Sequence, residues 1–185
     1  MSTRMKQTLV VGLMWLGIGM VARTAQAAST DTMTLAVTPG NVTYGVTISS
    51  PYPSGYNFAQ VNLGATTVST VAIVVNATGA NVAEYFGLAV SNTSGNWAAS
   101  ASAPSTDTFR MMGWFNTNPV SSSTFNTADA LTNSVVAAAG KYNQGSKTAP
   151  GTSANLWLRL DMPTALNTGT TGAQTMTLTV TGQPN

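Results

Sequence analysis

Long stretches of this chain alternate polar and apolar residues, and this period of two constrains the fold more than any other feature. The alternation is clearest in TMTLAV (residues 32–37), NVTYGVTI (41–48) and QTMTLTVT (174–181). Successive side chains of a β-strand point to opposite faces of the sheet, so the pattern predicts strands with one buried face. Residues 68–75 (VSTVAIVV) are rich in β-branched side chains and also favour a strand.

The remaining strands are expected between clusters of turn-forming residues. The same criteria predict strands at three further places: residues 85–90, 108–115 and 156–160. Residues 49–56 (SSPYPSGY) and 91–96 (SNTSGN) have the composition of loops. Seven to eight short strands separated by such loops are typical of an immunoglobulin-like antiparallel β-sandwich. We therefore predict a single all-β domain of this class.

One segment does not follow the strand pattern. Residues 126–139 precede Gly140 and contain Asn126 and Thr127, which are suitable helix caps. This favours a short helix over about 126–139. Val135 and Val136 are β-branched and disfavour a helix, so a long loop with a buried alanine patch remains the alternative.

The N-terminus has the composition of a secretory signal peptide. Arg4 and Lys6 give a positive start, residues 8–22 are mostly apolar, and Ala25-Gln26-Ala27 offers small residues for cleavage. The apolar run of roughly fifteen residues is shorter than the ~20 that a membrane-spanning helix needs. We therefore expect residues 1–27 to be removed.

Removal of the signal leaves residues 28–185 as the mature domain, without a further apolar run long enough to span a membrane. This predicts a secreted protein, extracellular or at the cell surface, with a periplasmic location left open. Three sequons could carry glycans in an organism that glycosylates them, and they begin at Asn41, Asn76 and Asn92.

The mature chain is almost uncharged. Arg4, Lys6 and Arg23 account for three of the seven basic residues, so four basic and five acidic side chains remain after cleavage, for a net charge of −1. This balance gives no basic surface for nucleic acid. Charged residues make up only 6% of the chain, against about 25% in ordinary domains. Weak electrostatic repulsion between copies favours a homo-oligomer or association with other surface proteins.

The residue types that carry most enzyme chemistry are absent. The chain has no histidine and no cysteine, which excludes Ser-His-Asp and Cys-His catalysis and zinc sites built on those ligands. Glu84 is the only glutamate, and the aspartates are scattered rather than gathered in a calcium loop. We expect no enzyme activity, no cofactor and no metal.

Residues 32–37 (TMTLAV) and 175–180 (TMTLTV) are nearly the same strand. They are expected either as ordinary terminal strands of one sandwich or as a device for assembly. In the second interpretation, the first segment leaves its own sheet and adds a strand to a neighbouring subunit, as in donor-strand complementation. The residues assigned to this role are Thr32, Met33, Leu35, Val37, Met176, Leu178 and Val180.

Three aromatic residues in or beside predicted loops form a second candidate site. Tyr52 and Tyr56 flank Pro53-Ser54-Gly55, and Trp97 follows another loop. Exposed rings can stack on sugar faces, so a glycan is the ligand expected of such a site. Packing of the tyrosines within their loop, and burial of Trp97 in the core, are the structural alternatives.

Residues 56–80 resemble a known family. The spacing Tyr56-x-Phe58-x-x-Val61-x-Leu63-Gly64, followed by the strand that ends at Asn76, is similar to secreted immunoglobulin-like domains of the abnormal-spindle/hydin type. Those domains usually have a glycine after the aromatic residue, where this chain has Ala59-Gln60. The resemblance implies an immunoglobulin-like fold in a structural or interaction role. The sequence thus favours a structural or adhesive component of a cell surface, and the alternative is a carbohydrate-binding module.

Overall fold

The computed structural model describes residues 41–49, 55–92, 97–167 and 172–184. Within these ranges the chain forms eight strands: β1 (Thr47–Ser49), β2 (Thr66–Val68), β3 (Ile73–Asn76), β4 (Tyr85–Asn92), β5 (Ala98–Ala99), β6 (Thr108–Phe115), β7 (Ser153–Asp161) and β8 (Met176–Gln183). Three short 3-10 turns are the helical elements of this part of the chain: η1 (Ser122–Thr124), η2 (Thr127–Asp129) and η3 (Lys141–Asn143). The predicted all-β class is confirmed. No helix in the described ranges has the length and apolarity needed to span a membrane.

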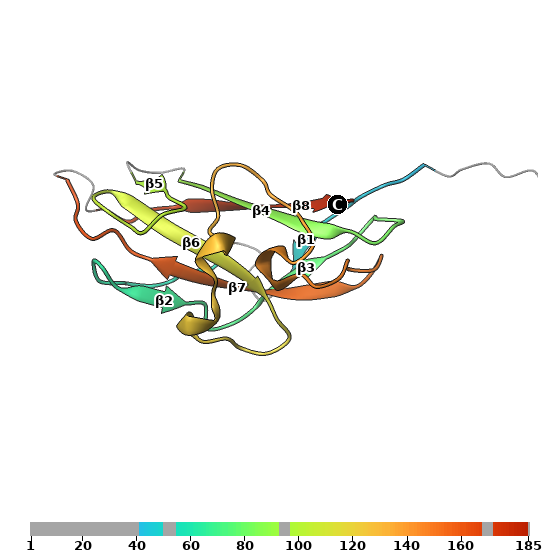
Figure 1. Ribbon diagram of the computed structural model, residues 1–185, viewed down its shortest axis with the longest axis horizontal. Coiled ribbons are helices and arrows are strands. Elements are labelled where there is room, and N and C mark those ends of the chain that lie inside the picture. The colour runs from blue at the N-terminus through green and yellow to red at the C-terminus, as the bar shows by residue number, and fades with distance from the viewer. Residues whose placement is uncertain (1–40, 50–54, 93–96, 168–171, 185) are drawn as a thin grey trace, which may run out of the picture. The chain divides into compact units, whose positions relative to one another are not determined.

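The strands form two sheets (Figure 1). The larger has the order β1-β3-β7-β6-β5, and β2 also pairs with β7. The smaller sheet is the antiparallel pair of β4 and β8. All pairs are antiparallel except β5 with β6, which is parallel. The larger sheet is therefore mixed, unlike the purely antiparallel arrangement expected from the sequence.

The strand expected over residues 68–75 is divided in two. β2 and β3 follow one another along β7, and residues 69–72 separate them. The amide of Ser69 donates to the carbonyl of Leu158, and its hydroxyl accepts a hydrogen bond from the amide of Leu158. Because the hydroxyl replaces a backbone partner, the ladder along β7 continues where the strand is broken.

The core lies between the two sheets. The inward side chains of β4 are Phe86, Leu88 and Val90, all almost completely buried. They pack against inward residues of the larger sheet, which include Ile73, Val75, Phe109, Met111, Leu156, Leu158 and Leu160. The sheets approach closely at Gly113 of β6, where an added Cβ would lie 2.6 Å from Leu88 Cδ1. Burial of each large apolar side chain contributes roughly 1.5–3 kcal/mol.

A second apolar cluster covers the opposite face of the larger sheet. It contains Met112, Trp157 and Phe125, and the half-buried Trp114 packs on it. The indole nitrogen of Trp157 donates to the carbonyl of Asn116 at 2.9 Å. Buried tryptophan needs such a partner for its N–H group. Both faces of β6 and β7 are therefore partly covered.

The helix expected over residues 126–139 is wrong. This segment contains the single 3-10 turn η2, followed by extended chain that bridges Met112 through Ala130 and Leu88 through Val136. The β-branched Val135 and Val136 favour that extended conformation. The loop alternative describes the segment, although its alanines are half-buried or exposed.

Candidate binding groove

An apolar groove with a volume of about 780 Å³ opens between the two sheets. Its floor consists of core residues, among them Val90 of β4, Met111 of β6 and Leu158 of β7. The chain around Tyr56 and Phe58 forms one wall, and Met176 and Leu178 of β8 form another. The volume falls within the range of roughly 300–1,000 Å³ that is usual for ligand pockets. The lining is mostly apolar, so it favours an apolar occupant.

The structure brings the two predicted sites together at this groove. Tyr56 and Trp97, predicted for glycan binding, line it alongside Met176 and Leu178, which were predicted for assembly. Val180 packs on the core next to it. The other predicted residues lie outside the described ranges, namely Tyr52, Thr32, Met33, Leu35 and Val37.

Tyr56 is held in the groove wall by contacts with neighbouring residues. The Tyr56 hydroxyl accepts a hydrogen bond from the Thr70 amide at 2.8 Å and lies 3.1 Å from the Thr70 hydroxyl. Its ring meets the ring of Phe58 edge to face, with centroids 4.8 Å apart. These contacts fix Tyr56 as part of the wall, which agrees with the loop-packing alternative.

Trp97 is only 8% exposed and belongs to the core cluster. Its ring therefore contributes to the groove from below and is not displayed on the surface. Stacking on a sugar needs an accessible ring face, so burial leaves Trp97 poorly suited to that role.

The turn beside Tyr56 adopts an unusual backbone conformation. Ala59 has φ 57°, in the left-handed region that favours glycine. The side-chain oxygen of Asn57 accepts a hydrogen bond from the Ala59 amide at 2.8 Å, which holds this turn. The turn directs the chain toward Leu63, a groove residue that is 49% exposed.

The most informative feature of the groove is the edge of β8. On β4, the amides of Leu88 and Val90 donate to carbonyls of residues 136 and 132, and the amide of Phe86 donates to the side chain of Gln144. Just before β4, the amide of Glu84 donates to the carbonyl of residue 148. The backbone groups of the even-numbered residues of β4 thus point away from β8. The backbone groups of its odd-numbered residues therefore form the hydrogen bonds with β8. Their register partners on β8 are residues 177, 179, 181 and 183.

By the same alternation, the backbone N–H and C=O groups of the even-numbered residues of β8 point to the edge of β8 that faces away from β4. Within the described ranges, no strand pairs with that edge and no backbone hydrogen bond reaches it. The same residues, Met176, Leu178 and Val180, turn their side chains toward the core but stay only half buried. The free edge and the incompletely covered side chains therefore belong to the same positions.

A buried acid lies near the far end of the β4–β8 pair. Glu84 is fully buried and faces Gly182, where an added Cβ would collide with its carboxylate. Oε2 accepts a hydrogen bond from the Gly45 amide at 3.2 Å, and Oε1 has no partner among the described residues. Burial raises the pKa of Glu84, and the Gly45 hydrogen bond offsets this only in part. A raised pKa favours the neutral carboxyl.

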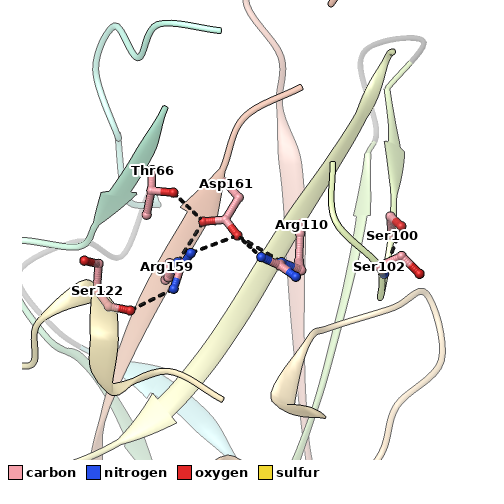
Figure 2. Close-up of polar contacts among 7 residues, drawn as sticks. All are labelled: Thr66, Ser100, Ser102, Arg110, Ser122, Arg159 and Asp161. Carbon is pink, nitrogen blue, oxygen red and sulfur yellow. Dashed lines mark hydrogen bonds and ion pairs between the residues drawn. The ribbon is translucent and has the colours of Figure 1, made fainter. Parts of the chain in front are cut away.

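A second buried acid, Asp161 of β7, is paired. Asp161 accepts hydrogen bonds from Arg110, Arg159 and the Thr66 hydroxyl on the outer face of β6 and β7 (Figure 2). Its closest ion pair is with Arg110 Nη2 at 2.6 Å. Burial acts to raise the pKa of Asp161, but the hydrogen bonds from Arg159, Arg110 and Thr66 outweigh it and lower the pKa. This cluster ties the strands together and lies away from the groove lining.

A third acid, Asp129, binds the segment around Tyr142, which lies against the outer edge of β4. Asp129 accepts a hydrogen bond from the Tyr142 amide at 2.9 Å and lies 3.7 Å from Lys141 Nζ. The Tyr142 hydroxyl donates to the carbonyl of Leu88 at 3.3 Å. Burial, with the nearby charge of Asp129, raises the pKa of Tyr142 to about 12. Tyr142 therefore stays protonated and keeps this hydrogen bond.

The groove lining contains no aspartate, glutamate, lysine or arginine among the described residues. No group of three or more metal-ligating side chains occurs anywhere in the described ranges. Neutral amide side chains do line the groove, namely Asn57, Gln60, Asn62 and Gln174, so it can bind by apolar contact and by uncharged hydrogen bonds. The sequence patterns predict Ile73, Met111 and Leu158 only as strand residues, because their place in a groove depends on which sheet edges meet.

Comparison with models of protein families, with curated proteins and with solved structures finds no match for this chain.

Proposed function

We propose that this chain is a secreted, non-enzymatic structural or adhesive component of a cell surface, and that it assembles with other copies through the groove. In this proposal, residues 1–27 are the export signal and residues 28–185 form one immunoglobulin-like sandwich. The location is extracellular or at the cell surface. The partner is a second copy or another surface protein.

The observation that carries the proposal is the outer edge of β8, which pairs with no described strand and lies beside an apolar groove. An edge strand with unpaired amides and exposed apolar side chains is a template for another strand. Natural monomers usually protect such edges with charges, prolines or covering loops. The described β8 residues include no charged residue and no proline. The edge is therefore suited to pairing.

The distribution of charge supports the same role. Asp161 and Asp129 are occupied by arginine or lysine partners, and Lys147 lies over the ring of Tyr85. Few charges remain to keep two copies apart. Exposed apolar side chains near the larger sheet's β1 edge, Val42, Tyr44 and Ile48, extend the contact surface.

Glycan binding is the second candidate, favoured by the presence of Tyr56 and Trp97 in one groove. The hydrogen bonds of Tyr56 to Thr70 and the burial of Trp97 both weaken it. A glycan array with the wild type and Tyr56→Ala separates the candidates. Glycan binding that is lost in Tyr56→Ala, by a protein that stays monomeric, would favour this second function.

The proposal is tested on the mature chain, residues 28–185, by size-exclusion chromatography with light scattering and by negative-stain microscopy. We expect high-mass species or fibres. Met176→Lys places a charge in the groove and should weaken assembly by at least about tenfold. Thr177→Lys is the matched control, because Thr177 is exposed and points away from the core, and it should still assemble. A strictly monomeric wild type would contradict the proposal.

A further inference from the structure

The acceptor surface has a definite position along β8. The groove touches Met176 and Leu178, at the end where β8 begins. The opposite end is closed by residues 41–46, since Gly45 bonds to Glu84 beside Gly182. An added strand therefore has access to the first half of β8 and to the core below it.

The first described residues lie at that closed end. The amide of Thr43 donates to Asn81 Oδ1 at 2.9 Å, and Asn81 Nδ2 donates to the carbonyl of Asn41 at 2.6 Å. These bonds hold Asn41 and Thr43 against Asn81, which precedes β4. Residues 28–40 precede this point in the sequence.

That segment contains a strand pattern complementary to the groove. Met33, Leu35 and Val37 are spaced by two residues, like Met176, Leu178 and Val180 on β8. In an extended strand these three side chains lie on one face. Six extended residues span about 20 Å, a length comparable to that of a typical strand. The intervening Thr34 and Ala36 would lie on the opposite face, as Thr177 and Thr179 do on β8.

The linker disfavours a tight hairpin between residues 32–37 and the residues that follow it. Only Thr38, Pro39 and Gly40 separate Val37 from Asn41. Pro-Gly favours type I or II turns, whereas tight hairpins need the mirror-image types. Proline also keeps the preceding Thr38 extended. A tight return of residues 32–37 onto residues 41–48 is therefore unfavourable.

We infer that residues 32–37 of a second copy occupy the groove and add a strand along the free edge of β8. This rests on the proposed function and names its partner segment. Met33, Leu35 and Val37 enter the apolar groove, while the backbone bonds to the even-numbered residues of β8. The donor segment and the groove are different surfaces, so the contact is heterologous and can repeat from copy to copy along a filament.

The test uses two variants of the mature chain that carry complementary defects. Leu35→Asp spoils the donor segment and leaves the groove intact, and Met176→Lys does the reverse. Each should lose assembly alone, and their mixture should give a heterodimer detectable by native mass spectrometry. Thr34→Asp, with the same charge on the opposite face of the segment, is the matched control and should assemble.

A peptide of residues 29–38 provides a second readout that does not depend on the folding of Met176→Lys. It should bind Leu35→Asp in a one-to-one ratio, and the same peptide with Leu35→Asp should not bind. Assembly of the Leu35→Asp protein at wild-type level would overturn this inference and leave the proposed function standing. Absence of both heterodimer and peptide binding would also overturn it. A wild type that stays monomeric would overturn the proposed function itself.

Discussion

β4 and β8 are partners in one small sheet, yet their surroundings differ. β4 is buried on both faces, and its outer edge bonds to residues 132, 136, 144 and 148. β8 is half exposed, and its outer edge has no partner among the described residues. Both strands carry alternating apolar side chains. The difference shows that a strand's neighbours, rather than its own composition, decide whether its edge is closed.

Two side chains, those of Gln144 and Tyr142, form hydrogen bonds with the outer edge of β4. Gln144 takes the place of a neighbouring strand, because its side-chain amide accepts from and donates to the backbone of Phe86 at 2.8 and 2.7 Å. Tyr142 bonds to the carbonyl of Leu88. No comparable side chain serves β8 in the described part of the chain. Among the described residues, the outer edge of β8 thus lacks the kind of contacts that close the outer edge of β4.

The largest expected effect comes from truncating matched leucines on the two strands. Leu88 of β4 is 0% exposed, and Leu178 of β8 is half buried. Leu88→Ala should lower the free energy of unfolding by about 3–5 kcal/mol, because it leaves a cavity against Gly113. Leu178→Ala in the monomer should cost less than half as much. Urea denaturation followed by tryptophan fluorescence measures both, and equal losses would contradict the contrast between the strands.

Proline substitution sharpens the contrast between the two edges of β8. Thr179 is the register partner of Ala89 and uses its amide in the ladder, so Thr179→Pro should cost roughly 2–3 kcal/mol. Val180 directs its amide to the free edge, where proline is tolerated. Val180→Pro should therefore keep the fold, apart from a smaller packing loss, and abolish assembly. The reverse order of thermal stability would show that the edge is wrongly assigned.

Removal of the side-chain partner should open the closed edge of β4. Gln144→Ala leaves both the amide and the carbonyl of Phe86 without the partner described above. An unmet buried polar group is unfavourable, so we expect a loss of about 2 kcal/mol. Gln60→Ala, at an exposed position, is the control and should be neutral. Indistinguishable unfolding curves for the two variants would show that Gln144 does not close this edge.

The smallest effect concerns pH and the closed end of the pair. The pKa of Glu84 is raised above its ordinary value of 4.5, so the folded state holds this proton more tightly than the unfolded state. The free energy of unfolding should therefore fall as pH rises from about 4.5 through the raised pKa. Glu84→Gln should remove this decline and be the more stable protein at alkaline pH. Parallel stability profiles from pH 4 to 9 would refute the assignment.

Asp161 provides the internal comparison for that titration. Its pKa is lowered by its arginine and threonine partners, despite its burial. The corresponding stability is present above the ordinary value of 3.8 and is lost as pH falls below it. The two buried acids thus act in opposite directions. Glu84→Gln should leave the acid limb of the profile unchanged.

Much of the fold could be predicted from the alternating sequence. The strands at β4, β6, β7 and β8 follow their hydrophobic pattern, since alternation reports directly which face is buried. The break at Ser69 could not be predicted, because it depends on hydrogen bonds to Leu158 in a distant strand. The parallel pairing of β5 with β6 is likewise a tertiary contact between short segments.

The groove itself was beyond sequence reasoning, although some of its residues were not. Met176 and Leu178 were identified by their likeness to residues 32–37, and Tyr56 by its place in a loop. Their common location depends on the pairing of β8 with β4 and on the spacing of the two sheets. Sequence alternation predicts which side chains face inward, but it does not predict which strand edge stays unpaired.

Amide hydrogen exchange along β8 tests the central claim most directly. In monomeric Leu35→Asp, the amides of Leu178 and Val180 should exchange rapidly, while those of Thr177, Thr179 and Thr181 should be protected by β4. In the wild-type assembly, Leu178 and Val180 should become protected as well. Uniform protection along β8 in the monomer, or no change at these two amides on assembly, would contradict the account.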